Sequence, residues 1–310
     1  MQVRRCYTLP LPAGPPLALG ERTLVMGVVN VTPDSFSDGG RWQDPERAAD
    51  HALALEAAGA DLLDVGGEST RPGADPVPAE EELRRVVPVL ERLAGRVRAP
   101  LSVDTSKSAV ARAAVGAGAA MVNDVSGLRR DPGLVGVVAE SGAALVIMHS
   151  RGRSRDMYRD ACYGDVGTEV ARELQASIAA AVAGGVDRSR ILVDPGLGFA
   201  KRTGQSWAAL AALGRLAALD RPILVGPSRK SFLAGGADGG PADRDWATAA
   251  AVTAAILEGA HVVRVHRVRE MRQVAEVADR CRDALEARRR VLAEGAGARV
   301  PAPAELPRSV

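Results

Sequence analysis

The feature that most constrains the fold of this chain is a regular alternation of short apolar runs and longer segments with helical spacing. The apolar runs lie at 24–31, 62–66, 101–105, 121–125, 144–149, 191–194, 223–226 and 262–266. The helical segments lie at about 45–58, 80–94, 107–117, 132–141, 166–183, 205–218, 244–258 and 268–289. Strands that alternate with helices form parallel sheets. About eight such units in about 250 residues predict a single closed (β/α)8 barrel, the TIM barrel of the α/β class.

The alternative is an open, doubly wound parallel sheet. No G-x-G-x-x-G turn follows the first apolar run, and this absence favours the barrel. We expect residues 1–22, which are rich in Pro, to form an N-terminal arm or edge hairpin and residues 23–290 to form the barrel domain. Residues 291–310 are rich in Ala, Pro and Gly and predict a disordered C-terminal tail.

Composition excludes several classes of function. Lys and Arg total 40 and Asp and Glu total 38, so the chain lacks the basic character of a nucleic-acid binder. The three cysteines are far apart and have neither zinc-site nor disulfide-framework spacing. Neither a secretory signal nor an apolar run of about 18 residues is visible, so we expect no membrane partner and a cytoplasmic protein.

Polar residues gather where the predicted strands end. They include Asn30, residues 68–73, Asp104, Asn123, Asp124, His149, Asp194, residues 228–230, Arg264 and His266. The carboxyl ends of barrel strands carry the active site, and alternate residues of a strand share one face. Buried polar groups without partners cost on the order of 1–3 kcal/mol each. Polar groups on this many strands therefore favour a ligand that pairs with them over an ordinary core.

The residue types indicate the chemistry of that ligand. Asp104, Asn123 and Asp194 suit a flat heterocycle with amino and ring N–H groups, such as a pterin or a purine. The cationic or potentially cationic residues suit phosphate oxygens, and they are Arg71, Lys230, Arg264 and His266. Barrels often bind phosphate after strands seven and eight, where Lys230 and Arg264 fall. The residues alone predict a heterocycle that carries a phosphate or pyrophosphate, and leave its reaction open.

Seven blocks together resemble the dihydropteroate synthases, and they occur in that family's order between about Thr23 and Arg282. The blocks are MGVVNVTPDSFSDGG, DLLDVGGESTRPGA, SVDTSK, NDVSG, DPGLGFAK, GPSRKSF and VRVH. The resemblance implies a cytoplasmic, homodimeric, pterin-binding TIM barrel. It also implies a transferase of tetrahydrofolate (folate) biosynthesis that joins 4-aminobenzoate to (7,8-dihydropterin-6-yl)methyl diphosphate. Pyrophosphate is released with magnesium present, and sulfonamides target the 4-aminobenzoate slot of this family.

The resemblance also implies roles for individual residues. The pterin would be held by Asp104, Asn123, Met148, Asp194 and Lys230. The diphosphate would be bound by Asn30, Arg71, Arg264 and His266, with metal binding by Asn30. The 4-aminobenzoate slot would be bordered by Thr70, Pro72, Phe199, Lys230 and Ser231. Asp34 and Ser35 would lie in a loop that folds over the substrates. Catalysis would depend on Asp104, Asp194, Lys230, Arg264 and His266.

Two positions depart from the family pattern. Ser206 stands where an Asn is typical, and Arg267 follows VRVH where an Asp is common. Each departure bears on the orientation of Phe199 or His266. Two other hypotheses therefore stand beside the synthase: a pterin-binding barrel that takes a methyl group from methyltetrahydrofolate, and a weakened paralogue that binds pterin without turnover. The ESTRPG and SRKSF blocks disfavour the first, and Lys230, Arg264 and His266 disfavour the second.

Overall fold

The core of the protein is an eight-stranded parallel sheet. A computed structural model describes residues 4–32, 45–69, 74–152, 157–234 and 240–297. The expected site residues Asp34, Ser35, Thr70, Arg71 and Pro72 lie outside these ranges. The strands are β3 (Leu24–Asn30), β4 (Leu62–Gly66), β5 (Leu101–Asp104), β6 (Met121–Asp124), β7 (Ala144–Met148), β8 (Ile191–Asp194), β9 (Leu224–Val225) and β10 (Val262–Val265).

The sheet closes into a barrel. Its strand order is β8-β7-β6-β5-β4-β3-β10-β9, and every neighbouring pair in it is parallel. A parallel bridge between Val193 and Ile223 joins the two outer strands, and the Val193 N–H donates to the Pro222 carbonyl at 3.0 Å. The predicted (β/α)8 barrel is confirmed.

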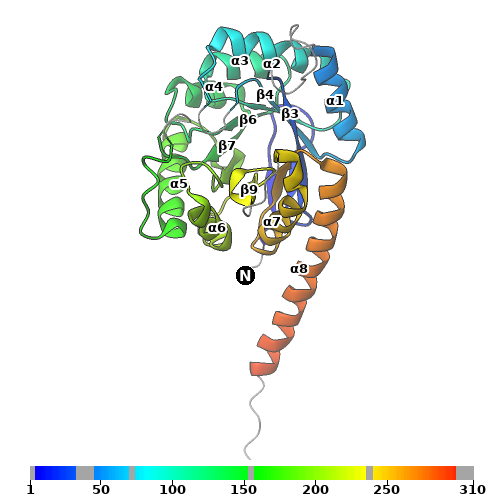
Figure 1. The fold of residues 1–310 in the computed structure, drawn as a ribbon, viewed down its shortest axis with the longest axis vertical. Coiled ribbons are helices and arrows are strands. Elements are labelled where there is room, and N and C mark those ends of the chain that lie inside the picture. The colour runs from blue at the N-terminus through cyan, green and yellow to red at the C-terminus, as the bar shows by residue number, and fades with distance from the viewer. Residues whose placement is uncertain (1–3, 33–44, 70–73, 153–156, 235–239, 298–310) are drawn as a thin grey trace, which may run out of the picture.

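Helices surround the strands (Figure 1). They are α1 (Pro45–Ala57), α2 (Ala79–Leu93), α3 (Ser108–Gly116), α4 (Gly133–Ser141), α5 (Val166–Ala183), α6 (Thr203–Ala211), α7 (Asp245–Leu257) and α8 (Val268–Gly297). Short 3-10 helices cover Arg188–Arg190 (η2), Leu213–Leu219 (η3), Ser231–Leu233 (η4) and Pro241–Arg244 (η5). The single helix expected over 205–218 is wrong: α6 ends before Gly214, a residue with poor helix propensity, and η3 follows.

The last helix is longer than the sequence predicted. α8 runs on to Gly297 and projects beyond the barrel (Figure 1). Residues 291–297 were expected to belong to the disordered tail but are helical, and they include the strong helix formers Leu292, Ala293 and Glu294. No helix in the described ranges is both long and apolar enough to cross a membrane.

The interior of the barrel is divided into an apolar end and a polar end. Side chains that alternate along the strands point inward, and at the amino-terminal end they are apolar, as Met26, Met121 and Val262 show. A hairpin of β1 (Tyr7–Leu9) and β2 (Leu17–Leu19) packs Leu9 and Leu19 against these residues. The residues expected to form an arm or an edge hairpin are thus a hairpin that closes the bottom of the barrel. Polar side chains are left at the opposite end.

Candidate active site

The polar end of the barrel collects most of the described residues that the sequence singled out. The inward-facing positions at the carboxyl ends of the strands are Asn30 (β3), Asp104 (β5), Asn123 (β6), Met148 (β7), Asp194 (β8) and Arg264 (β10). Strand parity explains this placement, because each of them except Asp104 shares a face with an apolar residue of the barrel interior, and Asp104 shares its face with the buried Ser102. Lys230, Ser231 and His266 follow directly after strands at the same end.

A buried carboxylate that the sequence analysis missed links three of the inward-facing residues. Asp64, in the middle of β4, is fully buried. Its Oδ2 accepts hydrogen bonds from Arg264 Nε at 2.6 Å and from Asn123 Nδ2 at 2.9 Å. Arg264 Nη2 donates to Asp104 Oδ2 at 2.9 Å. Asn123, Asp64, Arg264 and Asp104 therefore form one connected network across the barrel mouth.

The surroundings of Asp104 make it a weaker acid than usual. Burial raises the pKa of Asp104 to about 7, although the Arg264 guanidinium acts to lower it. Burial also raises the pKa of Asp194, against the lowering effect of Lys230. Carboxylates with raised pKa values in a recess are typical of functional sites.

Lys230 follows β9 and lies across the barrel mouth from Asp64 on β4 and Asp104 on β5. Its Nζ is 4.4 Å from the centre of the Phe199 ring and donates to the Leu197 carbonyl at 2.5 Å. Burial lowers the pKa of Lys230 to about 8, while Asp194 acts to raise it. Ser231, the next residue, is exposed at the start of η4. The structure thus brings together Lys230, Phe199 and Asp194.

The turn that follows β8 has an unusual backbone. Gly196, Gly198 and Ala200 all have positive φ angles, at 66°, 77° and 48°. A Cβ atom on Gly196 would lie 1.9 Å from the His149 carbonyl oxygen, so only glycine fits there. Asp194 Oδ1 accepts the Gly196 N–H at 2.7 Å. The Asp194 side chain therefore shapes the turn that carries Phe199.

Neither of the two departures from the family pattern, Ser206 and Arg267, disrupts the contacts around it. Ser206 is fully buried, accepts the Gly198 N–H at 3.1 Å and donates to the Lys201 carbonyl at 3.3 Å, so its hydroxyl supports the same turn. Arg267 forms ion pairs with Asp245 at 3.4 Å and Glu270 at 3.3 Å.

A serine hydroxyl fixes the ring of His266. Ser228 Oγ accepts the backbone N–H of His266 at 3.3 Å and lies 2.9 Å from its Nδ1. An oxygen that already accepts one proton is well placed to donate its own proton to Nδ1. The neutral imidazole then carries its proton on Nε2, which becomes a hydrogen-bond donor. Sequence reasoning singled out Ser228 but gave it no such role.

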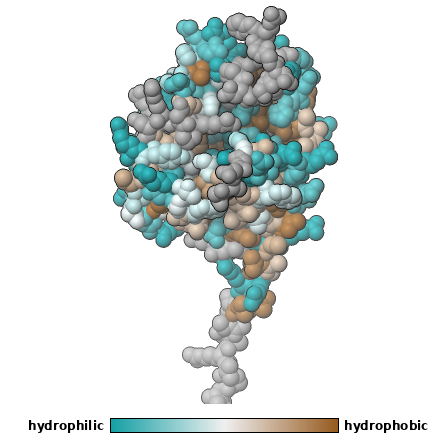
Figure 2. Space-filling model, viewed as in Figure 1, coloured by the Kyte–Doolittle hydropathy of each residue, from teal (hydrophilic) through white to brown (hydrophobic). Residues whose placement is uncertain are grey.

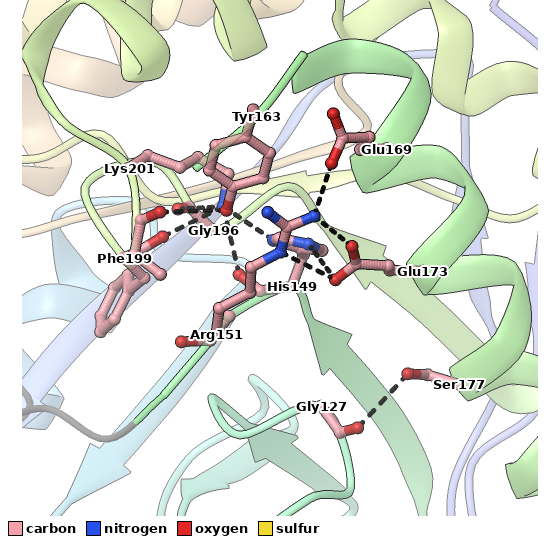
Figure 3. A network of polar contacts seen from close by, with 12 residues as sticks. Gly127, His149, Arg151, Tyr163, Glu169, Glu173, Ser177, Gly196, Phe199 and Lys201 are labelled. Carbon is pink, nitrogen blue, oxygen red and sulfur yellow. Dashed lines mark hydrogen bonds and ion pairs between the residues drawn. The ribbon is translucent and has the colours of Figure 1, made fainter. Parts of the chain in front are cut away.

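A second missed network lies behind the Phe199 turn (Figure 3). Its centre is Lys201, which is 1 % exposed and touches the ring of His149. Strand parity turns His149 away from the inward face of β7. Its ring is buried, and burial lowers its pKa to about 4.

The described residues offer few ligands for a metal ion. They contain no group of three or more His, Cys, Asp or Glu side chains that could hold one. Asn30, at the end of β3, is half-buried and pairs in register with Gly66. Magnesium commonly keeps several waters and takes only one or two protein oxygens beside substrate phosphates. A single amide oxygen from Asn30 fits this kind of site.

Comparison with known proteins agrees with this geometry. Residues 26–266 match the family described as pterin binding enzyme. A dihydropteroate synthase from Mycobacterium leprae is 50 % identical over 252 residues, which cover 79 % of this chain and 88 % of the relative. The Xanthomonas albilineans dihydropteroate synthase with 4-aminobenzoic acid is 47 % identical with a TM-score of 0.78, covering 87 % of this chain and 96 % of that one. A Yersinia pestis dihydropteroate synthase with a sulfonamide drug is 41 % identical with a TM-score of 0.81, covering 86 % of this chain and 97 % of that one.

Proposed function

Because this chain belongs to the pterin-binding enzyme family and is a dihydropteroate synthase of folate biosynthesis, we propose that its barrel mouth binds the two substrates side by side. The enzyme is a transferase that forms a C–N bond between a pterin methylene and an aromatic amine. Of the three hypotheses drawn from the sequence, the synthase is the one that the relatives support.

The observation that carries the assignment of the pterin pocket is the pairing of Arg264 with Asp104. A guanidinium is a planar group that presents several N–H donors, and the 2-amino pyrimidine edge of a pterin presents a similar set. Asp104 already accepts from such a donor at 2.9 Å, and Asn123 lies in the same network through Asp64. We assign Asp104, Asn123, Asp194 and Lys230 to the pterin, with Met148 against its ring.

The diphosphate would lie toward β3 and β10. His266, with its proton on Nε2, donates a hydrogen bond, and Arg264 supplies a cation close by. Arg71 is assigned here by the resemblance alone. Asn30 would hold the magnesium ion, which when bound stabilises the charge that develops on the leaving pyrophosphate.

The chemistry then needs no covalent intermediate with the protein. As the methylene–oxygen bond breaks, positive charge develops on the pterin methylene. Asp104 and Asp194, bonded to pterin N–H groups, stabilise that charge. The amine of 4-aminobenzoate attacks the methylene and loses its proton once the C–N bond has formed. Its slot is assigned to Thr70, Pro72, Phe199, Lys230 and Ser231, and Asp34 and Ser35 would lie in a loop that excludes water.

Pyrophosphate release by the purified enzyme tests this function. We expect release that requires both the pterin diphosphate and 4-aminobenzoate, and a loss of about 100-fold or more in Lys230→Ala, because a half-buried cation at the proposed reaction centre is removed. Arg202→Ala, an exposed cation in the loop before α6, is the matched control and should behave as wild type. Release without the amine, or an unaffected Lys230→Ala enzyme, contradicts the proposal. Tight binding of the pterin diphosphate without release would instead identify a weakened paralogue.

We further propose that the enzyme is a cytoplasmic homodimer. Large apolar side chains are exposed on α6, α7 and α8, and they are Trp207, Trp246, Val277, Leu285, Val291 and Leu292. Figure 2 shows apolar surface where α8 leaves the barrel. Exposed apolar surface of this kind is typical of an interface between subunits. The mass of the particle in solution, measured by light scattering, decides between one copy and two.

A further inference from the structure

Lys201 lies behind the Phe199 turn and has no place in the mechanism above. Its side chain is 1 % exposed, and a lysine is almost never fully buried unless it is paired. Lys201 Nζ donates to the carbonyls of Gly196 and Phe199, each at 3.1 Å, and lies 2.8 Å from His149 Nδ1 (Figure 3). These contacts join the end of β7 to both ends of the turn.

The backbone of the turn creates the need for this amine. Positive φ angles at Gly196, Gly198 and Ala200 turn the peptide groups so that two carbonyl oxygens converge on one buried point. Buried carbonyls without a donor are strongly unfavourable. The Gly196 carbonyl also accepts the Phe199 N–H at 3.0 Å, whereas the Lys201 amine is the donor that pairs the Phe199 carbonyl and ties it to the Gly196 carbonyl.

The charges behind the turn balance one another. With Nδ1 accepting from Lys201, His149 Nε2 donates to Glu173 Oε2 at 3.0 Å. Glu173 also pairs with Arg151, whose guanidinium bonds to Glu169 at 2.8 Å. Burial lowers the pKa of both Lys201 and His149, and Asp194 acts to raise that of Lys201. The protonated amine has three N–H donors, enough for the two carbonyls and for His149 Nδ1.

The opposite face of the same turn contacts Lys230. The Leu197 carbonyl accepts from Lys230 Nζ, and the Phe199 ring lies beneath that atom. The turn is therefore held between two lysines, one at its front and one at its back. We propose that Lys201 is a positioning residue that fixes Phe199 and thereby shapes the slot for the aromatic amine. This inference rests on the proposed function, in which Phe199 borders that slot.

A double-mutant cycle separates positioning from general stabilisation. The variants are Lys201→Met, Phe199→Ala and the double variant, with Arg202→Met as the exposed neighbour control. We expect Lys201→Met to raise KM for 4-aminobenzoate about 10- to 100-fold, since small displacements of a positioning group have effects of this size. The dissociation constant of the pterin diphosphate should stay within about twofold, because Lys201 acts only through the turn.

The double variant gives the decisive result. If Lys201 acts through Phe199, the KM for 4-aminobenzoate of the double variant equals that of Phe199→Ala. The proposal would be overturned by additive effects of the two substitutions on KM for 4-aminobenzoate, or by equally weakened binding of both substrates. A wild-type KM for 4-aminobenzoate in Phe199→Ala would overturn it as well. Should Lys201→Met fail to fold, Lys201→Gln replaces it in the cycle under the same criteria, because its amide nitrogen is one bond closer to the backbone than Nζ and leaves at least one of the two carbonyls without this donor. A wild-type enzyme without amine-dependent turnover refutes the proposed function and this inference together, whereas an additive cycle in an active enzyme refutes the inference alone.

Discussion

Replacing the buried carboxylate of Asp64 by an amide tests the central network of the site. Asp64 Oδ2 accepts from Arg264 and Asn123, whereas Oδ1 has no hydrogen-bond partner among the residues that the structure describes. In Asp64→Asn the amide oxygen can take the place of Oδ2 and keep both bonds, but the charge is lost and the amide NH2 takes the place of Oδ1, where no described residue accepts from it. A bond to a charged group contributes about 1.5–3 kcal/mol and a neutral one about 0.5–1.5 kcal/mol. The expected loss is about 1 kcal/mol for each bond, and the unpaired amide NH2 adds about 1–3 kcal/mol, so the free energy of unfolding should fall by about 3 kcal/mol or more.

The same change should weaken pterin binding. Without the charge on Asp64, Arg264 is drawn more strongly to Asp104, the carboxylate assigned to the pterin. A difference of 1–2 kcal/mol corresponds to a rise in KM for the pterin diphosphate of about 5- to 30-fold. Urea unfolding gives the stability and initial rates give KM. Asp50→Asn, the same change at an exposed position on α1, should stay within about 0.5 kcal/mol of wild type. If Asp64→Asn has the urea midpoint of the wild type and the wild-type KM for the pterin diphosphate, the network as described is refuted.

Three further predictions concern pH, the position of His266 and the hairpin. Below pH about 7 Asp104 gains a proton and loses its negative charge, and above about 8 Lys230 loses its positive charge, so kcat/KM should be bell-shaped with limbs near these values. Lys230→Arg should remove the alkaline limb. Ser228→Ala should raise KM for the pterin diphosphate about 2- to 10-fold, through loss of the hydrogen bond that orients His266, while KM for 4-aminobenzoate stays unchanged. Leu9→Ala should lower the free energy of unfolding by about 2–5 kcal/mol, because it leaves a cavity under the barrel, and kcat should be retained at permissive temperature.

The barrel could be predicted from the sequence because its signal is local and repeated. Each apolar run is a strand buried on both faces, and each following segment has a helical stripe. The position of the hairpin was not predictable in this way. Leu9 and Leu19 pack on Met26, Met121 and Val262, and contacts across such separations leave no periodic trace in the chain.

The candidate site likewise contains residues that could be predicted from the sequence and residues that could not. Asp104 and Asp194 were found because each lies at or next to the end of an apolar run, and Asn123 because it begins the polar pair Asn123-Asp124. Asp64 was missed because it lies inside the run, although the alternation of Leu62, Asp64 and Gly66 places it on the inward face. Lys201 could not be found by pattern, since lysine is normally exposed and its burial here depends on the conformation of the turn just before it and on His149, which is distant in the sequence.

The most direct test of the central claim is identification of the product formed from labelled 4-aminobenzoate. The enzyme is incubated with magnesium, the pterin diphosphate and 4-aminobenzoate carrying 15N in its amine, and the mixture is analysed by mass spectrometry. The account predicts 7,8-dihydropteroate that carries the label, in a one-to-one ratio to released pyrophosphate. Pyrophosphate accompanied by a hydrolysed pterin alcohol, with the labelled amine unchanged, would contradict it.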